Sequence, residues 1–176
     1  MSKLPTQKMN FNTQLKIGQQ FEVSLQETLS KAGLKTKSAT KTQQKQGIDF
    51  TLTSGKKLTF ECKWDKKSRQ TGNIFMEVVT GSKMGCVMTC KADYMVWKLG
   101  YEDDDDYLLV KPYQLIEYLV KFSKERDTSH FKTCRNSNGY AAVGSAIPVK
   151  SLDKYIYSSR WLVEKIKELN AKDKTV

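Results

Sequence analysis

Residues 47–64 read GIDFTLTSGKKLTFECKW, two runs of alternating apolar and polar residues around Ser54-Gly55. A period of two is typical of a strand, and a Ser-Gly pair between two such runs is typical of a turn. The stretch therefore predicts a β-hairpin with one apolar and one polar face. Its apolar face takes Ile48, Phe50, Leu52, Leu58, Phe60, Cys62 and Trp64.

The polar face of the predicted hairpin carries two acids and a lysine. Asp49 lies in the first run, and Glu61 and Lys63 are next neighbours on the same face of the second. Carboxylate oxygens are ligands that suit a hard divalent cation, which can activate a water molecule. The competing interpretation is an ordinary ion pair on a solvated surface.

The arrangement of Asp49, a hairpin and then Glu61-Cys62-Lys63 resembles the catalytic core of the PD-(D/E)XK nuclease superfamily. Ile48 stands where the family has a proline, and the specific likeness covers residues 17–99. The resemblance implies an α/β fold with a restriction-endonuclease-like core, in which helices flank a central mixed β-sheet. It also implies Mg²⁺, replaceable by Mn²⁺, as the cofactor.

In such a site, the resemblance implies that Asp49, Glu61 and the backbone carbonyl of Cys62 bind the metal. Lys63 would orient or deprotonate the attacking water. The products would carry a 5′-phosphate and a 3′-hydroxyl.

Two further acids are candidates for the same site. Residues 10–32 predict a helix that ends at Gly33, and Glu22 borders its apolar stripe. In resolvase-like and phage-type members of the superfamily a Glu on the first helix reaches the metal, so the resemblance implies this role for Glu22. Glu77, in a predicted strand at 74–79, would be an extra ligand or a partner of Lys63. Without the resemblance, Glu22 is a solvated helix residue and Glu77 a salt-bridge partner. The apolar stripe consists of Ile17, Phe21, Leu25 and Leu29.

The net charge of +11 favours a polyanionic partner. Five lysines and no acid lie between Lys31 and Gly47, and more cations follow the hairpin. The alternative is a solvated lysine-rich surface without a partner. We expect contacts to DNA from Lys45, Lys66, Lys67, Arg69 and Asn73.

The 176 residues predict one domain with a short flexible lead at 1–9. No run has the length of a membrane span or the apolar core of a signal peptide, so we expect no membrane contact and a cytoplasmic location. The resemblance implies a bacterial cell or a phage-infected host. The four cysteines are then reduced thiols, and Cys86-x-x-x-Cys90 alone does not make a zinc site.

The rest of the chain predicts further elements of an α/β domain. Residues 35–46 predict a basic loop or a ragged edge strand, and 65–73 a polar loop. Strands at 94–99 and 107–110 flank an acidic turn. The alternatives for its acids are binding a cation, limiting nonspecific polyanion binding, or no role beyond that of exposed turn residues. A helix begins at Pro112, followed by a loop at 127–138 that contains His130, a strand at 139–149 and a helix at 158–170. The last helix is expected to bury Trp161, Leu162, Ile166 and Leu169.

These observations predict a Mg²⁺-dependent DNA endonuclease that hydrolyses phosphodiester bonds. The resemblance implies a structure-selective enzyme similar to Holliday-junction resolvases, and a homodimer, because resolvases usually are dimers. One alternative is a sequence-specific restriction-type endonuclease. The other is a nucleic-acid-binding protein on a nuclease-like scaffold without catalytic activity.

Overall fold

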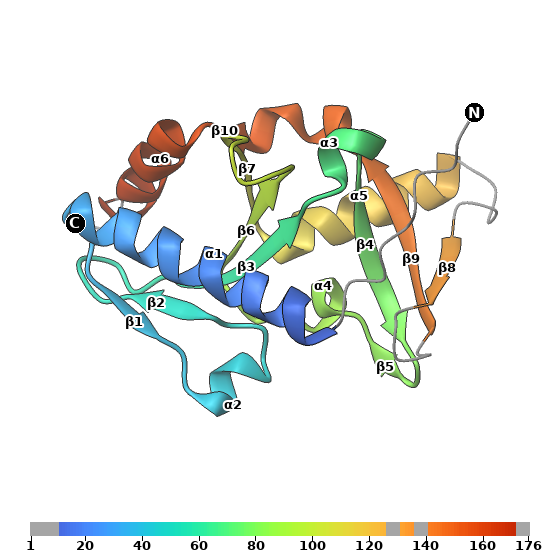
Figure 1. The fold of residues 1–176 in the computed structure, drawn as a ribbon, viewed down its shortest axis with the longest axis horizontal. Coiled ribbons are helices and arrows are strands. Elements are labelled where there is room, and N and C mark those ends of the chain that lie inside the picture. The colour runs from blue at the N-terminus through green and yellow to red at the C-terminus, as the bar shows by residue number, and fades with distance from the viewer. Residues whose placement is uncertain (1–10, 126–130, 136–140, 172–176) are drawn as a thin grey trace.

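Two β-sheets form the centre of the molecule (Figure 1), a computed structural model that describes residues 11–125, 131–135 and 141–171. The larger sheet has the strand order β1-β2-β3-β6-β7-β10 and the smaller one β5-β4-β9-β8. The larger sheet consists of β1 (Thr36–Ser38), β2 (Phe50–Leu52), β3 (Thr59–Asp65), β6 (Tyr94–Leu99), β7 (Asp106–Val110) and β10 (Ile156–Tyr157). The smaller sheet consists of β4 (Asn73–Thr80), β5 (Lys83–Met84), β8 (Phe131–Arg135) and β9 (Ala141–Pro148).

The larger sheet is mixed. Strands β3 and β6 are parallel, with Glu61 opposite Met95, whereas the four other neighbouring pairs are antiparallel. The predicted hairpin is confirmed, because β2 and β3 pair with Phe50 opposite Phe60. With helices on both faces of this sheet, the predicted α/β class with a central mixed sheet is also confirmed.

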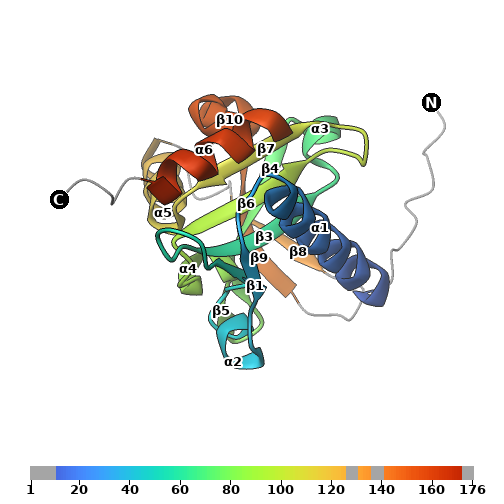
Figure 2. The ribbon, with the colours of Figure 1, turned by 90° about the vertical axis from the view of Figure 1, so that its left-hand side faces the viewer.

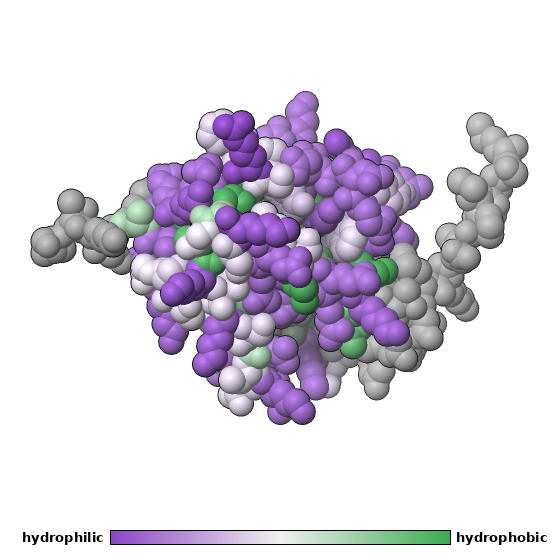
Figure 3. Space-filling view, turned by 60° about the vertical axis from the view of Figure 1, so that its left-hand side comes forward, coloured by the Kyte–Doolittle hydropathy of each residue, from purple (hydrophilic) through white to green (hydrophobic). Residues whose placement is uncertain are grey.

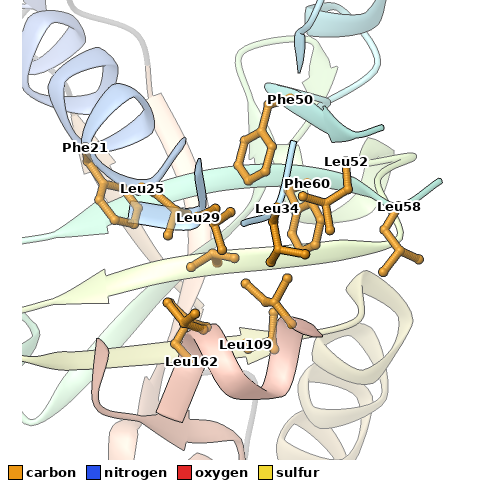
Figure 4. Packing of buried hydrophobic residues seen from close by; sticks show 13 residues of the cluster. Phe21, Leu25, Leu29, Leu34, Phe50, Leu52, Leu58, Phe60, Leu109 and Leu162 are labelled. Carbon is orange, nitrogen blue, oxygen red and sulfur yellow. The ribbon is translucent and has the colours of Figure 1, made fainter. Parts of the chain in front are cut away.

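Helices α1 (Phe11–Lys31) and α6 (Ser159–Ala171) cover one face of the larger sheet (Figures 1 and 2). Phe21, Leu25 and Leu29 of the apolar stripe pack there in one core with Phe50 and Phe60, whose rings stack 4.9 Å apart (Figure 4). Each large side chain buried in this way contributes about 1.5–3 kcal/mol to folding. The prediction for Trp161 is wrong, since the side chain is 65% exposed while the next residue, Leu162, fills the core position.

The opposite face of the larger sheet packs against the smaller sheet, α4 (Cys86–Thr89), α5 (Pro112–Glu125) and the 3₁₀ helix η2 (Val149–Tyr155). The predicted strand at 74–79 exists as β4 but belongs to this second sheet. The prediction of a loop over 127–138 is wrong at 131–135, where β8 pairs with β9. The two strands are consecutive in the chain, but residues 131–135 lack the strict alternation of apolar and polar residues that predicts a strand. His130 lies outside the described residues.

Short helices interrupt both predicted polar loops. α2 (Lys41–Gln44) starts at a capping box between Thr40 and Gln43, and α3 (Ser68–Thr71) follows β3. The edge strand predicted within 35–46 is confirmed as β1.

The outer surface is mainly hydrophilic. Figure 3 shows this for one face, on which apolar residues form only small separate patches. Within the described ranges, no helix is both long and apolar enough to cross a membrane.

Candidate active site

Strand β3 directs its acid and its lysine away from α1. Cys62 and Trp64 pack on the core beneath α1, so the alternation of the strand turns Glu61 and Lys63 to the opposite face. Asp49 precedes β2 at the position opposite Glu61, because Phe50 pairs with Phe60. Glu61 is only 5% exposed, and its carboxylate forms an ion pair with the ammonium group of Lys63.

Strand β2 pairs with β3 only as far as Phe60, so the later residues of β3 have no strand partner on that side. Beyond that point Asp49 replaces a paired strand: its backbone N–H donates to the Phe60 carbonyl at 2.8 Å, and its carboxylate accepts from the Cys62 N–H at 2.7 Å. The N–H and C=O of one strand residue point to the same edge. The Cys62 carbonyl therefore faces the side occupied by Asp49, as the resemblance implies for a metal ligand.

Glu22 joins this group from α1. Phe21 packs against Trp64 with ring centroids 6.3 Å apart, which fixes this turn of the helix over β3. Burial, followed by the nearby charges of Asp49 and Glu61, raises the pKa of Glu22 from 4.5 to about 7. The three acids Glu22, Asp49 and Glu61, called the carboxylate cluster below, therefore repel one another in the folded protein.

Burial and the ion pair between them act in opposite directions on the pKa values of Glu61 and Lys63. Burial raises the pKa of Glu61, and Asp49 raises it further, although Lys63 opposes both effects. Burial alone would lower the pKa of Lys63, but the charge of Glu61, its hydrogen bond and further negative neighbours hold it above its usual value. Lys63 is therefore a cation in this arrangement.

The donor types of the site fit Mg²⁺, which prefers carboxylate and carbonyl oxygens. A divalent cation would also relieve the repulsion that raises the pKa of Glu22. The side chains are not yet arranged as ligands: over the described residues, no group of three or more His, Cys, Asp or Glu could hold a metal. One physical reason is that Cys62 and Lys63 occupy oxygens of Asp49 and Glu61.

Glu77 stands apart from the carboxylate cluster, on β4 of the smaller sheet. It lies at an irregularity in the pairing of β4 with β9, between Glu77 and Val79. Its charge acts on the Cys86 thiol, as do the charges of Lys63 and Glu61. Glu77 therefore faces the same region from the second sheet, while the carboxylate cluster itself comes from α1 and the hairpin.

Two of the three predicted DNA-binding cations after β3, Lys66 and Arg69, are paired with acids. Lys66 contacts Glu102 at 2.5 Å, and Arg69 contacts Asp104 at 3.1 Å and Asp106 at 3.3 Å. We call residues 65–73 the basic loop and residues 102–106 the acidic turn. The two segments are distant in the sequence, so the sequence alone does not show that their charges form ion pairs with each other.

The other predicted DNA contacts differ in their surroundings. Lys45 and Lys67 are exposed. The side-chain amide of Asn73 donates to the Thr71 carbonyl at 2.6 Å, so it stabilises the turn before β4.

The sequence analysis also missed a contact that fixes the start of the hairpin. Gly47 adopts φ 69°, and its carbonyl accepts a hydrogen bond from the Cys90 thiol at 3.2 Å. A Cβ at position 47 would come within 3.1 Å of the Cys90 backbone, so glycine is required there. Cys90 thus has a structural role beside the segment that carries Asp49.

Of the predicted site residues, the structure brings together Glu22, Asp49, Glu61, Cys62 and Lys63, and it leaves Glu77 and the five predicted DNA contacts outside this group. The geometry is that of a buried acid–lysine centre at the free edge of a strand. No family model, curated protein or solved structure matched the chain.

Proposed function

We propose that this protein is a Mg²⁺-dependent endonuclease that hydrolyses phosphodiester bonds in DNA. The observation that carries the proposal is the convergence of Glu22, Asp49 and Glu61 beside a charged Lys63. Repulsion among three carboxylates destabilises the folded protein. A bound divalent cation would relieve this repulsion, which would strengthen its own binding.

In this function the carboxylate cluster and the Cys62 carbonyl would hold the metal. The bound ion would supply a more acidic water and neutralise charge on the scissile phosphate. Lys63, as a cation, stabilises the negative charge that grows on the phosphate oxygens and positions the attacking water by a hydrogen bond. The water oxygen bonds to phosphorus and releases a proton to solvent, the bond to the 3′ oxygen breaks, and that oxygen takes up a proton from solvent, so that one water is consumed.

DNA is the proposed substrate because the net charge is +11 and Lys45 and Lys67 are exposed near the site segments. The pairing of the basic loop with the acidic turn supports a selective enzyme, since these cations would not attract every duplex. A preference for branched or otherwise irregular DNA, and a homodimer that presents two sites, belong to the same proposal.

The test is a cleavage assay with supercoiled plasmid, linear duplex, single strand, four-way junction and RNA, each with Mg²⁺ and with EDTA. We expect Mg²⁺-dependent cleavage of DNA, with the junction cut fastest. The matched control is Asp103→Asn, which removes an acid of the acidic turn. Activity that persists in EDTA, or that survives Asp49→Asn, would refute the proposed site.

A further inference from the structure

A second hollow lies beside the candidate active site, where β3 and β6 begin and β7 ends. Its volume is about 420 Å³, within the range of small-ligand sites. Three lysines and two tyrosines are among its lining residues, namely Lys56, Lys91, Lys111, Tyr94 and Tyr113. We call it the Tyr113 pocket.

Two of the lining lysines, Lys91 and Lys111, keep charges that no ion pair with a protein acid neutralises among the described residues. The one acid in the lining, Asp93, accepts hydrogen bonds from the backbone and hydroxyl of Thr59 at 2.8 and 2.7 Å. The pocket therefore presents the cations of Lys91 and Lys111, while the Asp93 carboxylate is hydrogen-bonded to the start of β3.

Aromatic rings lie beside these cations. The ammonium group of Lys111 is 5.7 Å from the ring centroid of Tyr94 and 5.8 Å from that of Tyr113. Tyr113 is 53% exposed, so part of its ring is open to a planar ligand. An exposed aromatic ring beside unpaired lysines combines a stacking surface with phosphate attraction, as in sites for single-stranded nucleic acids.

The pocket is physically continuous with the hairpin. Lys91 donates its backbone N–H to Gln46 at 2.8 Å, and Cys90, another lining residue, is bonded to Gly47. Leu58 also lines the pocket and precedes Glu61 by three residues, about 10 Å along an extended strand. A nucleotide in the pocket would thus lie close to a phosphate at the carboxylate cluster.

We propose that the Tyr113 pocket binds a phosphorylated nucleotide of an unpaired strand, with its base on Tyr113 and its phosphate between Lys91 and Lys111. A paired duplex keeps its bases stacked inside and does not offer this face. The position of the bound strand relative to the scissile phosphate rests on the proposed function, whereas the binding of a nucleotide does not.

The test measures binding to the full chain in EDTA, where no cleavage occurs. The ligands are inorganic phosphate, thymidine 5′-monophosphate, a short fluorescent oligothymidylate and a blunt duplex of equal length. Amide resonances of Lys91, Lys111 and Tyr113 report the site, and fluorescence anisotropy reports the affinity for the oligonucleotide. The variants are Tyr113→Ala and the double variant Lys91→Gln/Lys111→Gln. The controls are Tyr101→Ala, a tyrosine of equal exposure elsewhere, and Lys150→Gln.

We expect Tyr113→Ala to weaken oligothymidylate binding about 5- to 150-fold, the usual loss of one stacked base, while Tyr101→Ala leaves it unchanged. The double lysine variant should weaken binding of mononucleotide and oligonucleotide alike and flatten the salt dependence. Unchanged oligothymidylate affinity in Tyr113→Ala, or phosphate bound as tightly as the nucleotide, would overturn the proposal. Wild-type cleavage without any change in the amide resonances of Lys91, Lys111 and Tyr113 would refute the nucleotide site alone. Nucleotide binding in the pocket without DNA cleavage would refute the proposed function alone.

Discussion

The carboxylate cluster and the acidic turn contain the same kinds of side chain and behave in opposite ways. In the cluster, burial and neighbouring acids raise the pKa of Glu22 to about 7 and also raise that of Glu61. In the turn, a hydrogen bond from Lys66 lowers the pKa of Glu102, and hydrogen bonds from the Tyr101 backbone and from Arg69 lower that of Asp104. Neighbouring charges repel the acids of the carboxylate cluster, whereas neighbouring hydrogen-bond donors stabilise the charged forms of Glu102 and Asp104.

This difference separates a candidate functional site from a structural contact. Glu102, Asp104 and Asp106 of the turn already have cations, so their charges connect the acidic turn to the basic loop. The acids of the cluster share one lysine among three carboxylates, so the folded protein alone does not satisfy them. Such unrelieved repulsion is typical of sites that a ligand completes. The predictions below test this contrast.

The largest effect is expected from removing a carboxylate of the cluster. Asp49→Asn or Glu61→Gln should reduce DNA cleavage by roughly 10³-fold or more, equivalent to about 4 kcal/mol, because both are proposed metal ligands. Asp104→Asn, a change of the same kind in the acidic turn, should alter the rate less than about threefold. Single-turnover cleavage with Mg²⁺ measures the rates of these variants. Equal losses of rate in the cluster variants and in Asp104→Asn would show that the two groups of acids do not differ in function.

Lys63→Ala should lower the single-turnover rate by about 10²–10³-fold, within the usual range for a group that assists proton transfer or stabilises developing charge. Because its neighbours keep Lys63 protonated, the charge is the larger part of its role. Lys63→Arg should therefore recover part of the rate, at most about tenfold. DNA affinity, measured in parallel in EDTA, should stay within a factor of about three. A variant Lys63→Ala with the wild-type rate would show that Lys63 is only a structural partner of Glu61.

Neutralising the acidic turn should strengthen DNA binding. The triple variant Glu102→Gln/Asp104→Asn/Asp106→Asn frees Lys66 and Arg69, and each new phosphate contact adds about 0.9 to the slope of log affinity against log salt. We expect about tenfold tighter binding at low salt and a steeper slope. Glu164→Gln, which breaks an ion pair on α6, is the control. An unchanged slope would place the DNA away from the basic loop.

The smallest effect concerns stability without metal. The pKa of Glu22 is about 7 in the folded protein and ordinarily 4.5, so between these values the native state binds more protons and stability falls as pH rises. Glu22→Gln should therefore stabilise the protein near pH 8 by about 1 kcal/mol, a value reduced for the part of the side chain that water reaches. Near pH 4.5 the gain should vanish. Urea unfolding in EDTA measures this, with the exposed Glu27→Gln as control, and a gain of the same size at both pH values would contradict the assigned repulsion.

The elements with strong local patterns could be predicted from the sequence. The apolar stripe of α1 and the alternation around Ser54-Gly55 gave the helix and the hairpin, since both periods record which face is buried. Glu22, Asp49, Glu61 and Lys63 were then proposed together from the resemblance, and their proximity follows from the packing of α1 on β3.

The remaining features depend on contacts between distant segments. Whether β4 joins the first or the second sheet depends on its pairing with β9, which no local pattern encodes. The ion pairs of Lys66 and Arg69 join residues more than thirty positions apart, so a cluster of basic letters did not show which cations are free. Trp161 illustrates the same limit, because the phase of α6 against the sheet decides which of two adjacent apolar residues is buried.

The parallel pairing of β3 with β6 limits when the candidate site can assemble during synthesis. The backbone groups of Glu61 and Lys63 point toward β6, a strand that is synthesised only after α3, β4, β5 and α4. Parallel strands far apart in sequence pair slowly, because the intervening chain must close first. A growing chain that ends before Tyr94 would thus have the carboxylates but no β6 to pair with their strand, and the amides of Glu61 and Lys63 should exchange freely with solvent. Under the proposed function, an unfinished chain would be harmless to the DNA around it.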